Sequence, residues 1–142
     1  MPNMTDTPDQ IRSSHHAEWS ILRASSLNAL LIGAPHLTAV AVGMLARGAR
    51  SPIVRWNPAQ WDIPAMVAGT LVIDDVDRLT PVQQERLARW IGGPGTGVQV
   101  LALVRAPLFA DVEMGRFSAS LYYRLNTVMV ELRVQADLPN GV

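Results

Sequence analysis

Five short, mostly apolar runs, separated by stretches of a different pattern, constrain the fold of this chain more than any other feature. The runs are Leu27–Ile32, Pro52–Trp56, Thr70–Ile73, Val98–Val104 and Thr127–Leu132. Runs that are apolar on both faces are typical of strands in a parallel sheet that helices cover on either side. The sequence therefore predicts a three-layer α/β fold around a five-stranded parallel sheet.

Helical patterns fill the intervals between these runs. We expect helices over His16–Ser25, Thr38–Arg47 and most of Leu108–Tyr123, and a short helix or a loop over Pro58–Met66.

The clearest helix start lies after the third run. Thr80 fits the N-cap, Pro81 the first helical position, and Gln83 closes a capping box. The apolar face of this helix is expected to comprise Leu87, Trp90 and Ile91, and Gly92–Gly95 to end it.

Composition excludes several classes of protein. The 142 residues suffice for one domain with a buried core, and the formal net charge of zero gives no general attraction to nucleic acid or anionic membranes. The absence of cysteine excludes disulfides and thiolate metal sites. No apolar run approaches the roughly 18 residues of a membrane span, so we expect a cytoplasmic protein without membrane contact. We expect a flexible tail over residues 1–14, a folded core over 15–135 and a second tail over 136–142.

The turn after the first run begins like a phosphate-binding loop. Counted from Gly33, the pattern G-x-x-x-x-G-K-[ST] requires glycine, lysine and a hydroxyl where this chain has Thr38, Ala39 and Val40. The lysine would contact the phosphates and the hydroxyl would hold magnesium. All twelve basic residues are arginine, so no other lysine of the chain can substitute.

Other residues of this turn also disfavour phosphate binding. Pro35 removes one backbone N–H, and Leu37 crowds the cradle. If a phosphate does bind, we expect Gly33, His36 and Thr38 to contact it, although a lone loop histidine is more often merely solvated.

Three stretches together resemble the sigma-54-dependent transcription activators, a family of AAA+ ATPases. Gly69–Asp75 is similar to the acidic strand motif G-T-L-F-L-D-E (Walker B), and Leu79–Leu87 to the helix that follows it. Gly115–Asn126 matches the family pattern G-[KR]-F-R-x-D-L-Y-Y-R-L-N at nine positions. The resemblance covers roughly residues 16–133 and implies a P-loop NTPase-like core with strand order 5-1-4-3-2.

The chain also departs from the family. Asp75 replaces a glutamate, Ser118 and Ser120 replace an arginine and an aspartate, and Leu103–Arg105 replaces the polar sensor. The G-A-F-T-G-A loop that contacts the sigma factor is absent, because Asn57–Ala68 leads almost directly into the third strand. We expect neither a helical lid nor a DNA-binding module.

The resemblance assigns three candidate site residues. Asp74 would bind the metal of a bound nucleotide, Asp75 would activate water, and Arg124 would be an arginine finger. The alternative is that both acids face solvent and cap the next turn, while Arg124 pairs with a nearby acid. Because the phosphate loop is defective, we favour this alternative, and we expect no catalytic residue and no cofactor; Mg-ATP or ADP is the other possibility.

Two further patterns have simpler explanations. Gly92–Gly97 precedes a strand rather than a helix, which favours a plain turn over a second phosphate loop. His15 and His16 lack further ligands for a metal and are expected to belong to the tail.

The leading hypothesis is a degenerate AAA+ domain that does not hydrolyse ATP and acts in transcription control as a regulatory or protein-interaction module. Its partner would be another protein or a second copy, bound at the flank that the family uses for ring assembly. One alternative is a switch that binds ATP or ADP without hydrolysis. Another is an accessory piece of a larger regulator.

Overall fold

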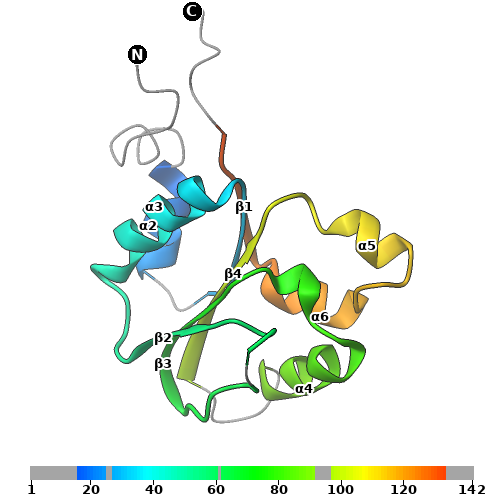
Figure 1. The fold of residues 1–142 in the computed structure, drawn as a ribbon. Coiled ribbons are helices and arrows are strands. Elements are labelled where there is room, and N and C mark those ends of the chain that lie inside the picture. The colour runs from blue at the N-terminus through cyan, green and yellow to red at the C-terminus, as the bar shows by residue number, and fades with distance from the viewer. Residues whose placement is uncertain (1–15, 25–26, 61, 92–96, 134–142) are drawn as a thin grey trace, which may run out of the picture.

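The computed structural model describes residues 16–24, 27–60, 62–91 and 97–133 (Figure 1). The expected tails, His15 and most of the Gly92–Gly97 turn lie outside these residues. In chain order the elements are α2 (His16–Ala24), β1 (Ala29–Ile32), α3 (Pro35–Ala46), β2 (Ile53–Trp56), β3 (Ala68–Ile73), η1 (Val76–Arg78), α4 (Pro81–Ile91), β4 (Gly97–Val104), α5 (Phe109–Glu113), α6 (Ala119–Leu125) and β5 (Val128–Glu131).

The strands form one five-stranded sheet in the order β2-β3-β4-β1-β5, and every neighbouring pair is parallel. This confirms the predicted α/β fold and the order 5-1-4-3-2, counted from the other edge. Strands β1, β3 and β4 lie in the middle and are almost entirely buried, which explains their unbroken apolar sequence.

Helices cover both faces of the sheet (Figure 1). On one face α2 and α3 pack through Trp19, Leu37 and Leu45 against alternate residues of the strands. On the other face α4 and α6 pack through Leu87 and Leu121 against the remaining alternate residues. Among the described residues no helix is long and apolar enough to cross a membrane.

Helix α4 begins as predicted. The Thr80 N–H donates to Gln83 Oε1 at 2.9 Å, and the Gln83 N–H donates to Thr80 Oγ1 at 3.2 Å, which is the expected capping box. Leu87 is fully buried on its apolar face, whereas Trp90 and Ile91 are half-buried.

Three expectations about helices need correction or completion. The expected helix over 108–123 is two helices, because the N–H groups of Arg116 and Phe117 both turn back to the Asp111 carbonyl. Ser118 then caps α6 by accepting from the Leu121 N–H at 3.1 Å. Helix α3 begins at Pro35 rather than Thr38. Residues 58–66 were expected to form a short helix or a loop, and those of them that the structure describes form a turn and a loop.

Gly69 allows β2 and β3 to approach each other. A Cβ at this residue would lie 2.3 Å from the Pro52 carbonyl oxygen, and its φ of +117° is one that other residues rarely adopt. The neighbouring Thr70 binds the same segment twice, through its N–H to Pro52 and its hydroxyl to the Arg50 carbonyl. The Gly69-Thr70 pair therefore fixes the lead-in of β2 against β3.

We expect Gly69→Ala to lower the free energy of unfolding by about 2–4 kcal/mol, because it combines backbone strain with a steric clash. Urea denaturation measures the effect. Gly43→Ala is the matched control: nothing lies within 4 Å of a Cβ there, and an exposed helical position should gain about 0.5–1 kcal/mol. Equal stability of the two variants would contradict this role of Gly69.

Gln84 is a buried polar residue on α4 that fixes the segment before α6. Its amide nitrogen donates to the carbonyls of Leu79 and Arg116 at 3.0 and 3.1 Å. Its amide oxygen accepts from the Ser118 N–H at 2.8 Å. One side chain therefore holds three backbone groups that would otherwise lose their hydrogen-bond partner.

Gln84→Leu should destabilise the fold by about 2–3 kcal/mol, because the three backbone groups would lose this partner while largely removed from water. Thermal and urea denaturation would detect this loss. The adjacent exposed substitution Glu85→Gln should stay within about 0.5 kcal/mol of the parent. The assignment fails if Gln84→Leu is as stable as Glu85→Gln.

Candidate functional site

The carboxyl ends of four neighbouring strands surround a pocket of about 200 Å³. Ligands of open parallel α/β folds bind at this edge. The lining residues include Gly33, Thr38, Arg55, Asp74, Asp75 and Arg105. The structure thus brings together four of the residues predicted from the sequence, namely Gly33, Thr38, Asp74 and Asp75. It adds two arginines to them, Arg55 and Arg105.

Asp74 is held by Arg55 from the neighbouring strand. The Arg55 Nη2 lies 2.5 Å from Asp74 Oδ1, and the side chains are 52% and 31% exposed. The Asp74 N–H also donates to the Trp56 carbonyl at 3.0 Å, continuing the β2–β3 pairing beyond β3. The carboxylate that the resemblance assigned to a metal therefore already has a cation beside it.

Asp75 stands in the left-handed region, with φ 48° and ψ 59°. Its carbonyl accepts from the Arg78 N–H and opens η1, but its side chain makes no capping hydrogen bond. Instead, Asp75 Oδ1 lies 3.7 Å from the Nε of Arg105, which follows β4. Each of the two acids is thus paired with an arginine from an adjacent strand.

The connection from β1 to α3 contains only Gly33 and Ala34. The Gly33 N–H donates to the Val104 carbonyl at 2.9 Å, and the N–H groups of Leu37 and Thr38 both donate to the Ala34 carbonyl. Pro35 has no N–H to offer. The amides of Gly33, Leu37 and Thr38, which could otherwise donate to a phosphate, are therefore used within the sheet and the helix.

Gly33 also has a packing role. A Cβ here would lie 3.1 Å from the Leu132 carbonyl oxygen and 3.2 Å from Leu132 Cβ. The residue thus lets the end of β1 pass close to the chain just after β5, and this contact needs no ligand.

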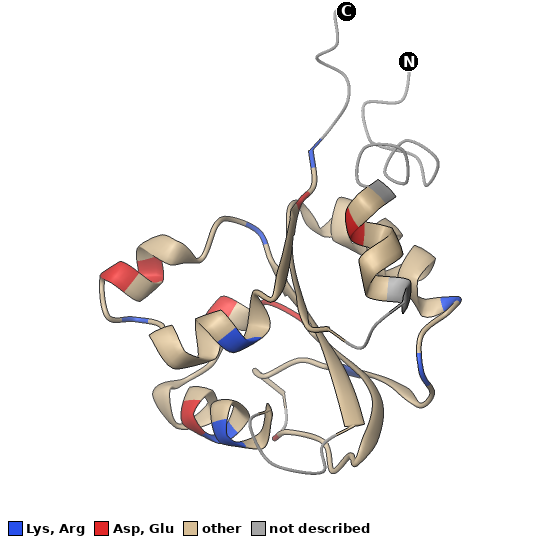
Figure 2. Cartoon of the chain, turned by 180° about the vertical axis from the view of Figure 1, so that it is seen from behind, with Lys and Arg blue, Asp and Glu red and all other residues tan. Residues whose placement is uncertain are grey.

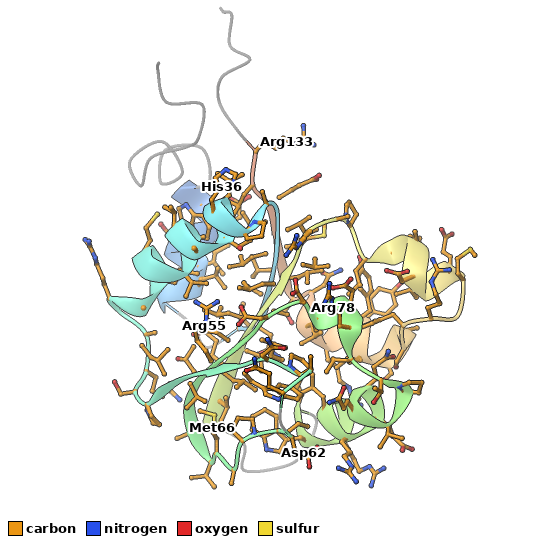
Figure 3. The ribbon with its side chains drawn as sticks, in the orientation of Figure 1. His36, Arg55, Asp62, Met66, Arg78 and Arg133 are labelled. Carbon is orange, nitrogen blue, oxygen red and sulfur yellow. The ribbon has the colours of Figure 1, made fainter. Side chains whose placement is uncertain are left out.

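The hydroxyl of Thr38 and the ring of His36 are not directed to a common ligand. Thr38 is buried, and its Oγ1 donates to the Pro35 carbonyl at 3.2 Å. His36 is exposed and lies at the first turn of α3, well away from Arg55 (Figure 3). Among the described residues, no group of three or more histidine or acidic side chains could hold a metal ion.

Arg124 lies on α6, away from this pocket. Its guanidinium donates to the Ala88 carbonyl on α4, and its own carbonyl accepts from Asn28 Nδ2 at 3.0 Å. The expected partner was an acid, but the observed partner is a backbone oxygen. Arg124 therefore connects two helices and the lead-in to β1.

Sequence reasoning missed Arg55 and did not pair Arg105 with an acid. A signal was present for Arg55: it is the polar residue of β2, and parallel pairing puts it beside Val72, two residues before Asp74. Long arginine side chains at such an edge reach the acids of the neighbouring strand.

The comparisons with known proteins agree with this architecture. Solved structures with the same fold include the NtrX protein of Brucella abortus in complex with ATP (TM-score 0.71, 16% identity, 98% of this chain and 41% of that one). Another is the P-loop NTPase domain of a sigma-54 activator from Escherichia coli (TM-score 0.69, 19% identity, 89% and 96% covered). The fold is that of P-loop NTPase domains.

Proteins that are similar in sequence point to a narrower group of proteins than the solved structures do. The transcriptional regulatory protein ZraR of Escherichia coli is 35% identical over 75 aligned residues, which cover 45% of this chain and 17% of ZraR. The response regulator PilR of Pseudomonas aeruginosa is 37% identical over 81 residues, covering 49% and 18%. No protein-family model matches. The chain is therefore a homologue of sigma-54-dependent activators, although it matches less than a fifth of their length.

The Arg55–Asp74 pair should couple measurably in a double-mutant cycle. With Arg55→Gln and Asp74→Asn, we expect a coupling free energy of about 0.5–1 kcal/mol at low salt, because both side chains are partly exposed, and less at high salt. The exposed pair Arg86–Asp62, 4.0 Å apart, should give a coupling near zero in the same urea titrations. Zero coupling for both pairs would show that the pocket ion pair does not contribute.

Proposed function

We propose that this chain is a regulatory module of bacterial transcription control that acts in the cytoplasm through protein contacts and does not hydrolyse ATP. Its homology to sigma-54-dependent activators supports the role in transcription. The observation that carries the proposal is the connection from β1 to α3, where the helix begins two residues after the strand. No loop of the length that surrounds phosphates is left there.

The charges of the pocket support the same proposal. Two aspartates and two arginines line it, and each acid has an arginine partner within 4 Å. Ala39 and Val40 provide neither the cation nor the hydroxyl that a phosphate and its metal would need. The volume of about 200 Å³ also lies below the 300–1,000 Å³ usual for ligand sites.

The short segment between β2 and β3 limits the ways in which this chain can contact a partner. The described residues there form a turn at Pro58–Gln60 and a loop to Val67. Gln83 Nε2 ties the turn down by donating to the Pro58 carbonyl at 2.9 Å. We therefore propose that this chain does not contact a sigma factor through a G-A-F-T-G-A-like loop, and that its partner binds on the helical flank.

A second candidate is a switch that binds ATP or ADP without hydrolysis. NtrX, which shares the fold, has been solved with ATP and with ADP. The pocket at the carboxyl edge of the sheet lies where such a ligand would bind.

Titration calorimetry separates the two candidates. For the proposed module we expect no heat from Mg-ATP or Mg-ADP, corresponding to a dissociation constant weaker than about 1 mM. The variant Arg55→Gln should behave in the same way, because freeing Asp74 does not lengthen the β1–α3 connection. Heat without phosphate release would support the switch. Steady-state phosphate release that Asp75→Ala abolishes would overturn the absence of hydrolysis.

A further inference from the structure

A second, larger hollow of about 520 Å³ lies between α4 and the segment that leads into and through α6. It is separate from the pocket at the strand ends, because the two share no lining residue. The residues that matter here are Glu85, Ala88, Arg89, Arg116, Phe117 and Arg124. We call this hollow the α4–α6 groove.

The α4–α6 groove is positively charged. Three arginines and one glutamate line it, in a chain whose formal net charge is zero. Figure 2 shows blue segments on α4, on α6 and in the loop that joins α5 to α6. The groove thus concentrates positive charge that other parts of the chain balance.

Arg116 and Arg89 can exchange their present carboxylate partners for those of a ligand. Arg116 pairs with Asp111 at 3.0 Å and Arg89 with Glu85 at 3.4 Å, but all four side chains lie at or near the surface. Exposed pairs of this kind contribute about 0–1 kcal/mol, so an incoming carboxylate can compete for them.

Arg124 differs from the other two arginines. Its guanidinium donates to the Ala88 carbonyl, and no carboxylate among the described residues pairs with it. Ser120 lies four residues earlier on α6, where an acid would pair with Arg124 along the helix. Within the described part of the chain this guanidinium, with its several donors, therefore has no acidic partner.

The groove is partly apolar, because Phe117 and Ala88 line it together with the arginines. Gln84, another lining residue, holds the backbone of Arg116 and Ser118. Apolar surface beside three arginines suits a peptide with both acidic and apolar residues, whereas the carboxylate of Glu85 interrupts the basic surface. A nucleic acid would require a larger, uniformly basic surface.

We propose that the α4–α6 groove binds an acidic segment of a partner protein, with Arg124 accepting a carboxylate and Arg116 and Arg89 flanking it. This inference rests on the proposed function. It adds which surface binds the partner and what chemical character the partner's segment has. Because Arg124 approaches α4 through a backbone oxygen, its position is set before the partner arrives.

The test uses a fluorescein-labelled peptide of alternating leucine and glutamate, and the same peptide with glutamine for glutamate. Fluorescence anisotropy with the full chain should show binding of the glutamate peptide only, weakening as salt rises. Arg124→Gln should weaken binding about tenfold or more, because it removes a charge-assisted hydrogen bond. Arg47→Gln, at the exposed end of α3 on the other face of the sheet, should leave binding unchanged.

Ser120→Asp provides a second arm that keeps every arginine. The new carboxylate should pair with Arg124 from within the helix and weaken peptide binding about twofold, less than Arg124→Gln does. The matched neutral variant Ser120→Asn should retain most of the affinity. Circular dichroism establishes that each variant folds, and Ser120 is exposed, so both substitutions should be tolerated.

Three outcomes would overturn the inference. These are no binding of the glutamate peptide, equal binding of the glutamine peptide, or binding that neither Arg124→Gln nor Ser120→Asp weakens. Self-association that Arg124→Gln abolishes, without peptide binding, would assign the groove to a second copy instead. None of these outcomes changes the nucleotide titration, so failure here is distinct from failure of the proposed function.

Discussion

The short connection between β1 and α3 is the constraint on which the candidate site depends. Because α3 starts two residues after β1, its first turn packs directly over the edge of the sheet, and its first amide hydrogen bonds close on Ala34. Gly33 has no side chain that would crowd Leu132 at this connection. The pocket that remains is small, and two arginine–aspartate pairs line it instead of backbone donors.

Much of this architecture could be predicted from the sequence, since burial on both faces forces strands to be apolar along their whole length. The capping box at Thr80 and the strand order implied by the resemblance were also correct. The start of α3 was not predicted, although proline is favoured at a first helical position. Gly33, Asp74 and Asp75 do meet at one pocket, but pattern matching does not reveal which arginine from another strand neutralises an acid.

The two hollows differ in how their charges are satisfied. In the pocket at the strand ends both aspartates have an arginine from a neighbouring strand, so these charges are paired within the chain. In the α4–α6 groove positive charge exceeds negative charge, and among the described residues Arg124 donates to a carbonyl oxygen and pairs with no carboxylate. A domain with the fold of P-loop NTPases can therefore have its excess charge on a flank rather than at the usual ligand edge.

The three hydrogen bonds of Gln84 have a mechanical consequence. They join α4 directly to the backbone from Arg116 to Ser118. Any force that a bound partner exerts on Arg116 is thereby transmitted to α4. Through the capping box and Gln83, it also reaches the turn after β2. Side-chain hydrogen bonds thus run from the backbone at Arg116 through the start of α4 to the turn after β2.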